Sequence, residues 1–379
     1  EIALGGLCMK EFRIVPTIKQ YDTVKEFCEQ IHPIKGDLMF ISGGTYRRYF
    51  EGLTGEAKVV DYRQYIQGEP SDAMVEKMHD AVGDYEYRRV IAVGGGAILD
   101  VAKLFALKTM MPVLDLYDKK ISQVRDKELI LVPTTCGTGS EVTNIGVLML
   151  ESRNTKFGLA DDAMFGDEAI LIPELLEGLP FRFFATSSID ALIHAIESFT
   201  SPKASPFSRM YSIEAIRMIL NGFKDIAANG EDARLSHMKG FLMASTYAGI
   251  AFGNAGCAAV HAMSAPLGGV YHVPHGEANY VLLTEVYKTY QRLQPVGAIR
   301  DLNRLISGIL GCPENKAYDA LDDLLNQLLK KQPLRAYGVK ESDLEEFTDI
   351  VIEKQGRLTA NNYTALNRET VLGIYKALY

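Results

Sequence analysis

Apolar and polar positions follow two different patterns along the chain, and the pattern changes near residue 180. Before that point, short continuous apolar runs alternate with polar stretches of helical spacing, such as residues 71–82. Strands that read as continuous apolar runs are typically buried on both faces, so this half predicts a parallel sheet covered by helices. The predicted strands cover residues 38–42, 58–61, 89–93, 129–132, 142–150, 155–159 and 169–172.

After residue 180 the apolar positions recur at helical spacing, and no strand signal of comparable strength occurs. The predicted helices cover residues 181–199, 206–220, 235–251, 257–267, 276–290, 296–309, 315–329, 341–353 and 368–378. We therefore predict an α/β domain over residues 1–180 and an all-α domain over residues 181–379. Because ligand sites commonly lie between domains, the cleft between the two is the expected functional site.

The composition is that of a globular protein, with 47% hydrophobic and 23% charged residues among 379. These values exclude a disordered chain, a collagen-like fibre and a coiled coil. Forty basic and 48 acidic residues give a net charge of −8, which disfavours nucleic acid and favours a small-molecule ligand. The five cysteines form no C-x-x-C pair, which favours a reducing, cytoplasmic location over a disulfide framework or a thiolate metal site.

Two segments raise questions about targeting and membranes. Residues 1–8 lack the basic start and long apolar run of a signal peptide, and Met9 follows them, so we expect an upstream extension there. Residues 240–276 contain no Asp, Glu, Lys or Arg, but they hold three histidines and many glycines. A lipid-facing helix would leave such polar groups without partners, so we expect a buried helical core around a polar site and no membrane partner.

Three glycines follow the strand predicted at residues 89–93 and lead directly into a helix. Gly94, Gly95 and Gly96, followed by Ala97, leave backbone N–H groups accessible at the positive end of that helix. This arrangement suits a diphosphate, although the G-x-G-x-x-G spacing of the ordinary Rossmann fingerprint is absent. A plain glycine turn is the alternative interpretation.

A second loop, rich in glycine and hydroxyl groups, follows the strand predicted at residues 129–132. Thr134, Thr135, Thr138 and Ser140 lie in it, and hydroxyl and backbone groups of this kind can bind a nucleotide. Capping of a following helix is the alternative for Thr138 and Ser140. Since loops after neighbouring parallel strands meet at the carboxyl edge of a sheet, we expect the two loops to form one nucleotide site.

A third cluster combines one aspartate and three histidines. Asp190 and His194 stand at positions i and i+4 of a predicted helix, which places them on one face about 6 Å apart along the axis. His261 and His275 belong to the charge-free stretch, where buried polar groups need compensation. One Asp and three His form a ligand set that suits Fe²⁺ or Zn²⁺. Core histidines bound to backbone groups are the alternative.

At these three clusters the chain resembles the iron-dependent (group III) alcohol dehydrogenases, and the resemblance covers nearly its whole length. Residues 94–103 look like the family motif G-G-G-S-x-x-D-x-A-K, and residues 133–141 match P-T-T-x-G-T-G-S-E in full. The resemblance implies the dehydroquinate-synthase-like fold, NAD as cofactor, and Fe²⁺ as the metal with Zn²⁺ as the alternative. The residues implied in cofactor binding are Gly43, Gly94, Gly95, Gly96, Ala97, Asp100, Thr134, Thr135, Thr138, Ser140 and Lys156, and those implied in metal binding are Asp190, His194, His261 and His275.

Two departures from the family pattern leave roles open. Many relatives carry a second histidine four residues after the third metal ligand, thought to relay a proton, where this chain has Ala265. We expect His272 to serve as the catalytic proton relay instead, with a structural hydrogen bond as its alternative. NAD-preferring relatives often carry an aspartate after the second strand, where this chain has Gly43, with Arg47 and Arg48 nearby. We expect NAD, and NADP stays open.

Residues 132–144, 186–195, 247–256 and 271–280 are most similar to one branch of the family, the bacterial 4-hydroxybutyrate dehydrogenases. That resemblance implies a metal-dependent oxidoreductase that interconverts 4-hydroxybutyrate and succinate semialdehyde by hydride transfer, as a homodimer or higher homo-oligomer. Arg182, Arg357 and His272 are the residues considered for binding the substrate carboxylate. The alternatives are a dehydrogenase of another short alcohol or diol, such as butanol or 1,3-propanediol, a non-redox enzyme of the dehydroquinate-synthase type, and a nucleotide-binding protein without turnover.

Overall fold

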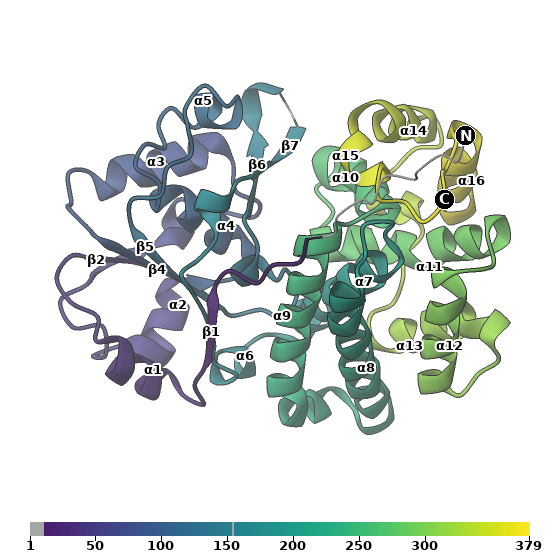
Figure 1. The fold of residues 1–379 in the computed structure, drawn as a ribbon, viewed down its shortest axis with the longest axis horizontal. Coiled ribbons are helices and arrows are strands. Elements are labelled where there is room, and N and C mark those ends of the chain that lie inside the picture. The colour runs from purple at the N-terminus through teal and green to yellow at the C-terminus, as the bar shows by residue number, and fades with distance from the viewer. Residues whose placement is uncertain (1–10, 154) are drawn as a thin grey trace, which may run out of the picture.

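The structure, a computed structural model, describes residues 11–153 and 155–379. Residues 1–8, which the sequence assigns to an upstream extension, lie outside the described residues. Figure 1 shows an α/β lobe formed by the first half of the chain and a helical lobe formed by the second half. The predicted fold class is therefore confirmed. The chain passes from strands to helices between β8 (Glu168–Leu171) and α7 (Phe181–Thr200), on either side of residue 180.

Six parallel strands form the central sheet, in the order β1-β8-β5-β4-β2-β3. Besides β8 they are β1 (Thr17–Gln20), β2 (Asp37–Ile41), β3 (Lys58–Asp61), β4 (Arg89–Gly94) and β5 (Glu128–Pro133). The strands predicted for this sheet are present, but β1 is a strand that the sequence pattern does not predict. Ile18 is the only apolar residue among its four, so β1 lacks the apolar run by which the others are recognised.

Helices cover both faces of the sheet, and alternate strand residues point to opposite faces. Phe40 and Leu131 belong to one apolar core, with α3, α4 and α5, whereas Ile91 and Ile130 belong to the other, with α1. This two-sided burial explains why the strands read as continuous apolar runs. The helices of this lobe are α1 (Val24–Ile31), α2 (Gly43–Thr45), α3 (Asp72–Val82), α4 (Gly96–Phe105), α5 (Val113–Tyr117) and α6 (Glu174–Glu177).

The helices of the second lobe enclose one large apolar core, in which α7, α8 and α9 pack side by side. Besides α7 they are α8 (Pro206–Asn229), α9 (Met238–Ala255), α10 (Ala259–Tyr271), α11 (His275–Leu293), α12 (Ala298–Leu310), α13 (Ala317–Leu328), α14 (Asp343–Lys354), α15 (Gly356–Thr359) and α16 (Arg368–Leu378). Ser205 caps α8 ahead of Pro206, and Gly256, at φ +80°, ends α9. Every helix predicted for this half is present. Within residues 11–153 and 155–379, no helix has the length and apolar character needed to cross a membrane.

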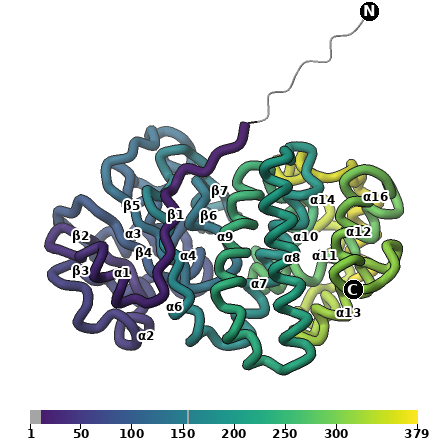
Figure 2. Tube along the Cα trace, turned by 60° about the horizontal axis from the view of Figure 1, so that its bottom comes forward, coloured from purple at the N-terminus to yellow at the C-terminus, as the bar shows by residue number. Residues whose placement is uncertain are grey.

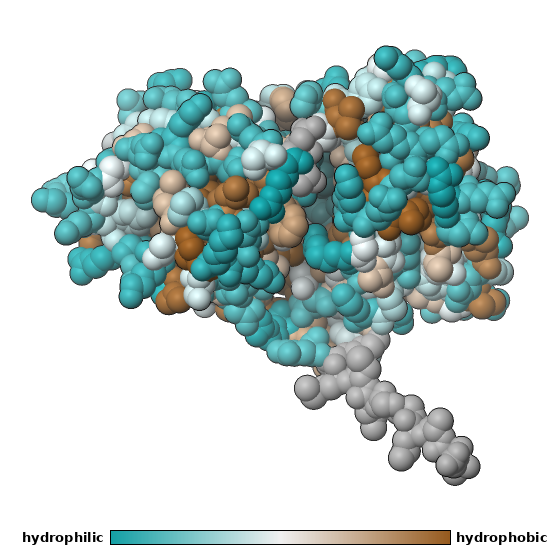
Figure 3. Space-filling view, turned by 90° about the horizontal axis from the view of Figure 1, so that it is seen from above, coloured by the Kyte–Doolittle hydropathy of each residue, from teal (hydrophilic) through white to brown (hydrophobic). Residues whose placement is uncertain are grey.

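An antiparallel hairpin leaves the main sheet and faces the helical lobe. It consists of β6 (Ile145–Leu150) and β7 (Thr155–Ala160), and β7 contacts α10. The hairpin lies opposite α10 and α15 in Figure 1, and Figure 2 shows the same two lobes side by side after a turn of 60°. Seen from above, the surface is hollowed between the lobes (Figure 3). This cleft is bordered by the hairpin on one side and by α10 and α15 on the other.

Candidate active site

The two glycine-rich loops lie side by side at the carboxyl edge of the sheet, because β4 and β5 are neighbouring strands. A Cβ atom on Gly96 would lie 2.6 Å from Cγ2 of Thr138, so only glycine fits there without a shift. Gly95 is the N-cap of α4, and the first N–H groups of a helix have no partner within it. The start of α4 therefore presents donors that suit an anion. The expected convergence of the two loops is observed.

Asp100 and Ser140 bind each other across the two loops. Ser140 Oγ donates to Asp100 Oδ1 at 2.5 Å, and the N–H of Val147 donates to Asp100 Oδ2 at 3.0 Å. Lys103, which is fully buried, donates from Nζ to Ser140 Oγ at 2.8 Å and to a β6 carbonyl at 2.7 Å. These contacts hold the second loop and the start of β6 against α4. Asp100 and Ser140 thus position the walls of the site.

Gly43 follows β2 in the short helix α2, and a carboxylate from the neighbouring strand lies against it. A Cβ atom on Gly43 would lie 2.7 Å from Asp61 Oδ2 and 3.3 Å from Arg47 Nη1. Asp61 ends β3, which pairs in parallel with β2, so both strand ends reach the same edge of the sheet. The sequence shows no aspartate directly after the second strand, but the structure supplies one from the third. An aspartate at such an edge can accept hydrogen bonds from ribose hydroxyls.

Lys156 reaches into the cleft from β7. A Cβ atom on Gly268 of α10 would lie 2.7 Å from Lys156 Nζ, and Nζ donates to Glu69 Oε1 at 2.5 Å. Lys156 therefore lies between the α/β lobe and the helix that carries His261.

The structure brings Asp190, His194, His261 and His275 together, with one potential ligand atom from each lying within 4.8 Å of the others. The first two lie one turn apart on α7, the third lies on α10, and the fourth begins α11. Asp190 Oδ1 is 3.8 Å from His261 Nε2 and 3.9 Å from His275 Nε2. Two ligands about 2.1 Å from one ion at a tetrahedral angle are about 3.4 Å apart, so the spacing is close to that of a metal site. The side chain of His275 is 46% exposed and opens this buried cluster on one side.

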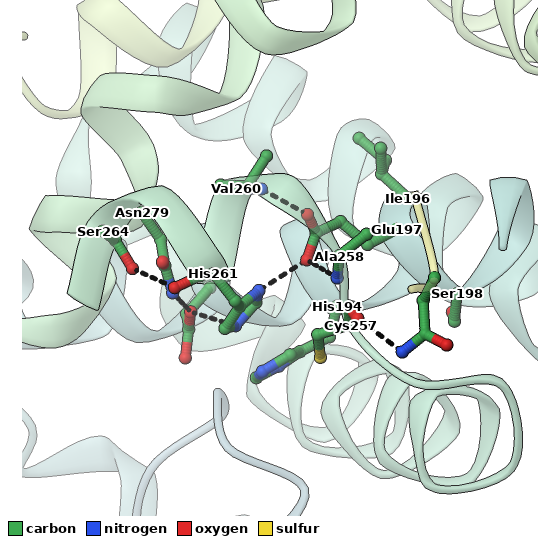
Figure 4. A network of polar contacts seen from close by, with 12 residues as sticks. His194, Ile196, Glu197, Ser198, Cys257, Ala258, Val260, His261, Ser264 and Asn279 are labelled. Carbon is green, nitrogen blue, oxygen red and sulfur yellow. Dashed lines mark hydrogen bonds and ion pairs between the residues drawn. The ribbon is translucent and has the colours of Figure 1, made fainter. Parts of the chain in front are cut away.

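Hydrogen bonds on the far side of two rings direct their Nε2 atoms toward the cluster. His194 Nδ1 donates to the carbonyl of Gly137 at 3.2 Å, and the ring stacks on Phe252. His261 Nδ1 donates to Glu197 Oε2 at 2.6 Å (Figure 4). Histidines that bind metals typically donate their other ring N–H to a carbonyl or carboxylate in this way.

Glu197 is a functional residue that the sequence analysis does not identify. It is fully buried on α7, and its carboxylate also accepts the N–H groups of Ala258 at 2.9 Å and Val260 at 2.6 Å (Figure 4). One carboxylate therefore both caps the start of α10 and orients His261. The sequence does contain a signal that could have identified it, because Glu197 follows Asp190 by seven residues and therefore lies on the same face of the helix.

Burial and neighbouring charges set the protonation of the cluster. Burial lowers the pKa of His194 to about 4, so this ring is neutral at pH 7 and suited to be a ligand. Burial opposes protonation of His261 too, but Cys257 and Glu197 raise its pKa well above the ordinary value. Burial raises the pKa of the Cys257 thiol and keeps it neutral, so the Glu197 carboxylate is the charge responsible. Burial also acts against ionisation of Asp190, but the three imidazoles outweigh it and lower the pKa.

The surroundings of His261 Nε2 indicate whether a metal ion fits the cluster. This atom is buried and has no hydrogen-bond partner among the described residues, although buried polar atoms normally have one. An ion at the centre of the cluster satisfies it and receives the nitrogen and oxygen ligands that Fe²⁺ and Zn²⁺ accept. Glu197, Cys257 and His261 form a second group within 4.8 Å, but Glu197 already accepts three N–H groups and needs no ion.

For several residues predicted to bind the cofactor or relay a proton, the described part of the structure shows no contact that defines the role. Thr134, Thr135 and Thr138 are half-buried just beyond the end of β5, and Ala97 is half-buried in the first turn of α4. His272 adopts a left-handed conformation (φ +53°) at the end of α10, and its side chain is exposed. Within the described residues, the side chain of His272 forms no hydrogen bond with the metal cluster. Cofactor binding by the first four and proton relay by His272 stay predictions.

Comparison with family models covers most of the chain. Residues 20–173 match the model described as iron-containing alcohol dehydrogenase. Residues 184–379 match the C-terminal model of the Fe-containing alcohol dehydrogenase family.

Individual relatives match over nearly their whole length. The 4-hydroxybutyrate dehydrogenase of Clostridium kluyveri is 48% identical over 371 residues, which cover 98% of this chain and all of that protein. The long-chain-alcohol dehydrogenase 1 of Geobacillus thermodenitrificans is 35% identical over 90% of this chain and 88% of its own. Among solved structures, sulfoacetaldehyde reductase from Bifidobacterium kashiwanohense in complex with NAD⁺ superposes with a TM-score of 0.82 at 22% identity, covering 98% of both chains. A 1,3-propanediol oxidoreductase gives 0.83 at 23%, covering 98% and 100%. The two structures establish the fold alone.

Proposed function

Since this chain belongs to the iron-containing alcohol dehydrogenase family, we propose that it interconverts 4-hydroxybutyrate and succinate semialdehyde, with NAD as hydride carrier and Fe²⁺ as its metal. The observation that carries this proposal is the full-length likeness to the Clostridium kluyveri 4-hydroxybutyrate dehydrogenase. The Asp–His cluster at the cleft supports it, because it offers the ligand set that a metal-dependent dehydrogenase requires.

Each part of the cleft has a role under this proposal. The N–H groups of Gly95, Gly96 and Ala97 hold the cofactor diphosphate, and the missing side chains of the glycines permit close approach. The hydroxyls of Thr134, Thr135 and Thr138 and the Lys156 ammonium hold other parts of the dinucleotide. Asp61 accepts the ribose hydroxyls beside Gly43, which supports NAD over NADP.

Asp190, His194, His261 and His275 hold the metal ion in this scheme. When bound, the ion supplies Lewis-acid polarisation of the substrate oxygen, which favours loss of the alcohol proton. Hydrogen bonds to the Gly137 carbonyl and to the Glu197 carboxylate orient the rings of His194 and His261. The exposed edge of His275 leaves room for substrate on the cleft side, and His272 is our proposed route for the proton to solvent. The nicotinamide supplies the hydride chemistry, and the protein aligns it with the carbinol carbon.

Steady-state kinetics test the substrate. The proposal predicts that kcat/KM for 4-hydroxybutyrate with NAD exceeds that for 1-butanol by at least about 100-fold, because a charged group bound in the cleft contributes about 3 kcal/mol. Equal values for the two alcohols would overturn the 4-hydroxybutyrate assignment. The second candidate, a dehydrogenase of uncharged alcohols, is favoured by the likeness to the long-chain-alcohol dehydrogenase and predicts that 1-butanol or a longer alcohol is preferred.

We also propose that the enzyme is a cytoplasmic homodimer. Among the described strands, edge strand β1 pairs on one side only. Ile18 in this strand is 39% exposed, and Ile14 and Val15 before it are 40% and 48% exposed. An open strand edge with exposed apolar side chains favours pairing with a second copy. The described cysteines (Cys28, Cys136, Cys257 and Cys312) all have free thiols, which supports a reducing compartment.

A further inference from the structure

A substrate that carries a carboxylate needs a cation or several N–H donors at the far end of its binding site. In extended form, 4-hydroxybutyrate measures about 6 Å from hydroxyl oxygen to carboxylate oxygen, because each of the five bonds advances about 1.25 Å along a zigzag chain. Adding a hydrogen bond of about 2.9 Å places the required donor on the order of 9 Å from the reacting oxygen. The cations that border the cleft at this range are therefore the candidates.

Arg357 projects into the cleft from α15. Its Nη2 lies 3.5 Å from the position that a Cβ atom on Gly158 would occupy. Gly158 lies on β7 two residues after Lys156, and residues two apart share one face of a strand. Lys156 on that face contacts Gly268 of α10. Arg357 and Lys156 therefore lie on the same side of the hairpin, in the gap between β7 and the helical lobe.

The same gap lies at the correct range from the metal cluster. Gly268 follows His261 by seven residues on α10, so the two share a helix face about 10 Å apart along the axis. A substrate whose hydroxyl lies at the cluster is therefore long enough to place its carboxylate near β7 when it extends along α10.

Ion pairing distinguishes Arg357 from the other cations. Lys156 is paired with Glu69 at 2.5 Å, and Arg182 with Glu277 at 2.9 Å. Tyr337 also donates to that glutamate at 2.9 Å, which fixes it on Arg182. Arg357 is exposed, and within the described part of the chain its guanidinium has no hydrogen bond or ion pair. A guanidinium presents a planar pair of N–H donors that matches both oxygens of a carboxylate, which the single imidazole of His272 does not offer.

We infer that Arg357 binds the substrate carboxylate and is the residue that makes this enzyme selective for a hydroxy acid. The inference rests on the proposed function. Binding leaves the guanidinium charged and forms two hydrogen bonds to the carboxylate, and no proton or electron moves.

Kinetics of Arg357→Gln and Arg357→Lys, with Arg182→Gln as the matched control, test the inference. For Arg357→Gln we expect KM for 4-hydroxybutyrate to rise about 10- to 100-fold, the loss typical of a hydrogen bond to a charged group, with kcat and the KM for 1-butanol little changed. Arg357→Lys should recover part of the loss, and Arg182→Gln should not change the ratio of the two substrates. An unchanged ratio in Arg357→Gln would overturn the inference.

Butyrate, which has the carboxylate but no reacting hydroxyl, provides a readout that is independent of turnover. Its Kd for the NAD complex of the holoenzyme, measured by calorimetry, should rise by the same factor in Arg357→Gln. Equal affinity in the variant and the wild type would contradict the inference. If wild-type enzyme shows no preference for 4-hydroxybutyrate over 1-butanol, the proposed function itself fails. If that preference is present and survives in Arg357→Gln, only the assignment of Arg357 fails.

Discussion

At the scale of single residues, the cluster depends on groups behind it as much as on the ligands themselves. Glu197 accepts three N–H groups with one buried carboxylate and so ties the orientation of His261 to the start of α10. Gly137 does the same for His194 through a backbone carbonyl. Neither residue belongs to a ligand set that sequence spacing would suggest, yet both decide which ring nitrogen faces the ion.

Replacing Glu197 with Gln should weaken metal binding about 10- to 100-fold, because the amide no longer holds the charged acceptor against His261 Nδ1. Competition with a chelator of known affinity measures the loss. Glu141→Gln changes another fully buried glutamate, outside the cluster, and should leave metal affinity as in the wild type. Equal metal affinity in the two variants would show that Glu197 serves only to cap α10.

Asp61 should set the choice between NAD and NADP. Its carboxylate lies beside Gly43 and repels a 2′-phosphate, whereas Arg47 on the other side of the glycine attracts one. In Asp61→Asn we therefore expect the ratio of kcat/KM for NADP to that for NAD to rise at least about 10-fold, the equivalent of 1.4 kcal/mol. Initial rates at fixed alcohol concentration give this ratio. A ratio that stays constant would place the adenosine ribose away from this strand end.

At the scale of elements, the loop after β5 is held against α9 by a buried acid. Glu141 accepts a hydrogen bond from Thr246 Oγ1 at 2.8 Å, and burial raises its pKa. A carboxyl group with a raised pKa favours the folded state most below its ordinary pKa, and this contribution is lost as pH rises through the folded-state pKa. Ionisation of the buried Glu141 above that pKa therefore lowers the free energy of unfolding, and a neutral side chain at this position avoids the loss.

Glu141→Gln keeps the oxygen that accepts from Thr246 and removes the buried charge. We expect the Tm of the variant, relative to wild type, to be higher at pH 8 than at pH 5, since each unit of pKa shift corresponds to about 1.4 kcal/mol. Thermal unfolding at the two pH values checks the sign. A Tm difference that is equal at the two pH values, or larger at pH 5, would contradict a raised pKa for Glu141 in the folded state.

The open edge of β1 predicts the mode of association. Ile18→Lys places a charge on the exposed edge and should convert the proposed homodimer to a monomer, as measured by light scattering during gel filtration. Ile34→Lys changes an isoleucine that is 53% exposed outside the strand and should leave the dimer intact. A dimer that survives Ile18→Lys would place the interface elsewhere.

At the scale of the whole molecule, the sequence predicted most of what depends on local periodicity. Parallel strands buried on both faces, the long helices and the i, i+4 relation of Asp190 and His194 all follow from spacing along the chain. The convergence of the two glycine-rich loops also follows, because neighbouring parallel strands end at one edge. The short edge strand β1 could not be predicted from periodicity, since Ile18 is the one apolar residue among its four.

Contacts between residues far apart along the chain could not be predicted from the sequence. Asp61 meets Gly43, Glu197 meets His261 and Arg357 meets Gly158 only after the chain has folded. Each pair joins different strands or helices, so no periodicity marks it. In our proposals these long-range contacts determine cofactor choice, ligand orientation and substrate selectivity, whereas the metal ligands themselves were recognisable from family motifs.

The metal content of purified protein tests the central claim most directly. We expect about one Fe²⁺ or Zn²⁺ per wild-type chain, and less than about a tenth of an ion in His261→Ala, because the site loses a buried ligand. His79→Ala, at a partly exposed histidine outside the cluster, should keep the wild-type content. NADH binding, followed by fluorescence, should be retained in both variants while dehydrogenase activity disappears only from His261→Ala. A wild-type metal content in His261→Ala, or turnover by metal-free enzyme, would contradict the account.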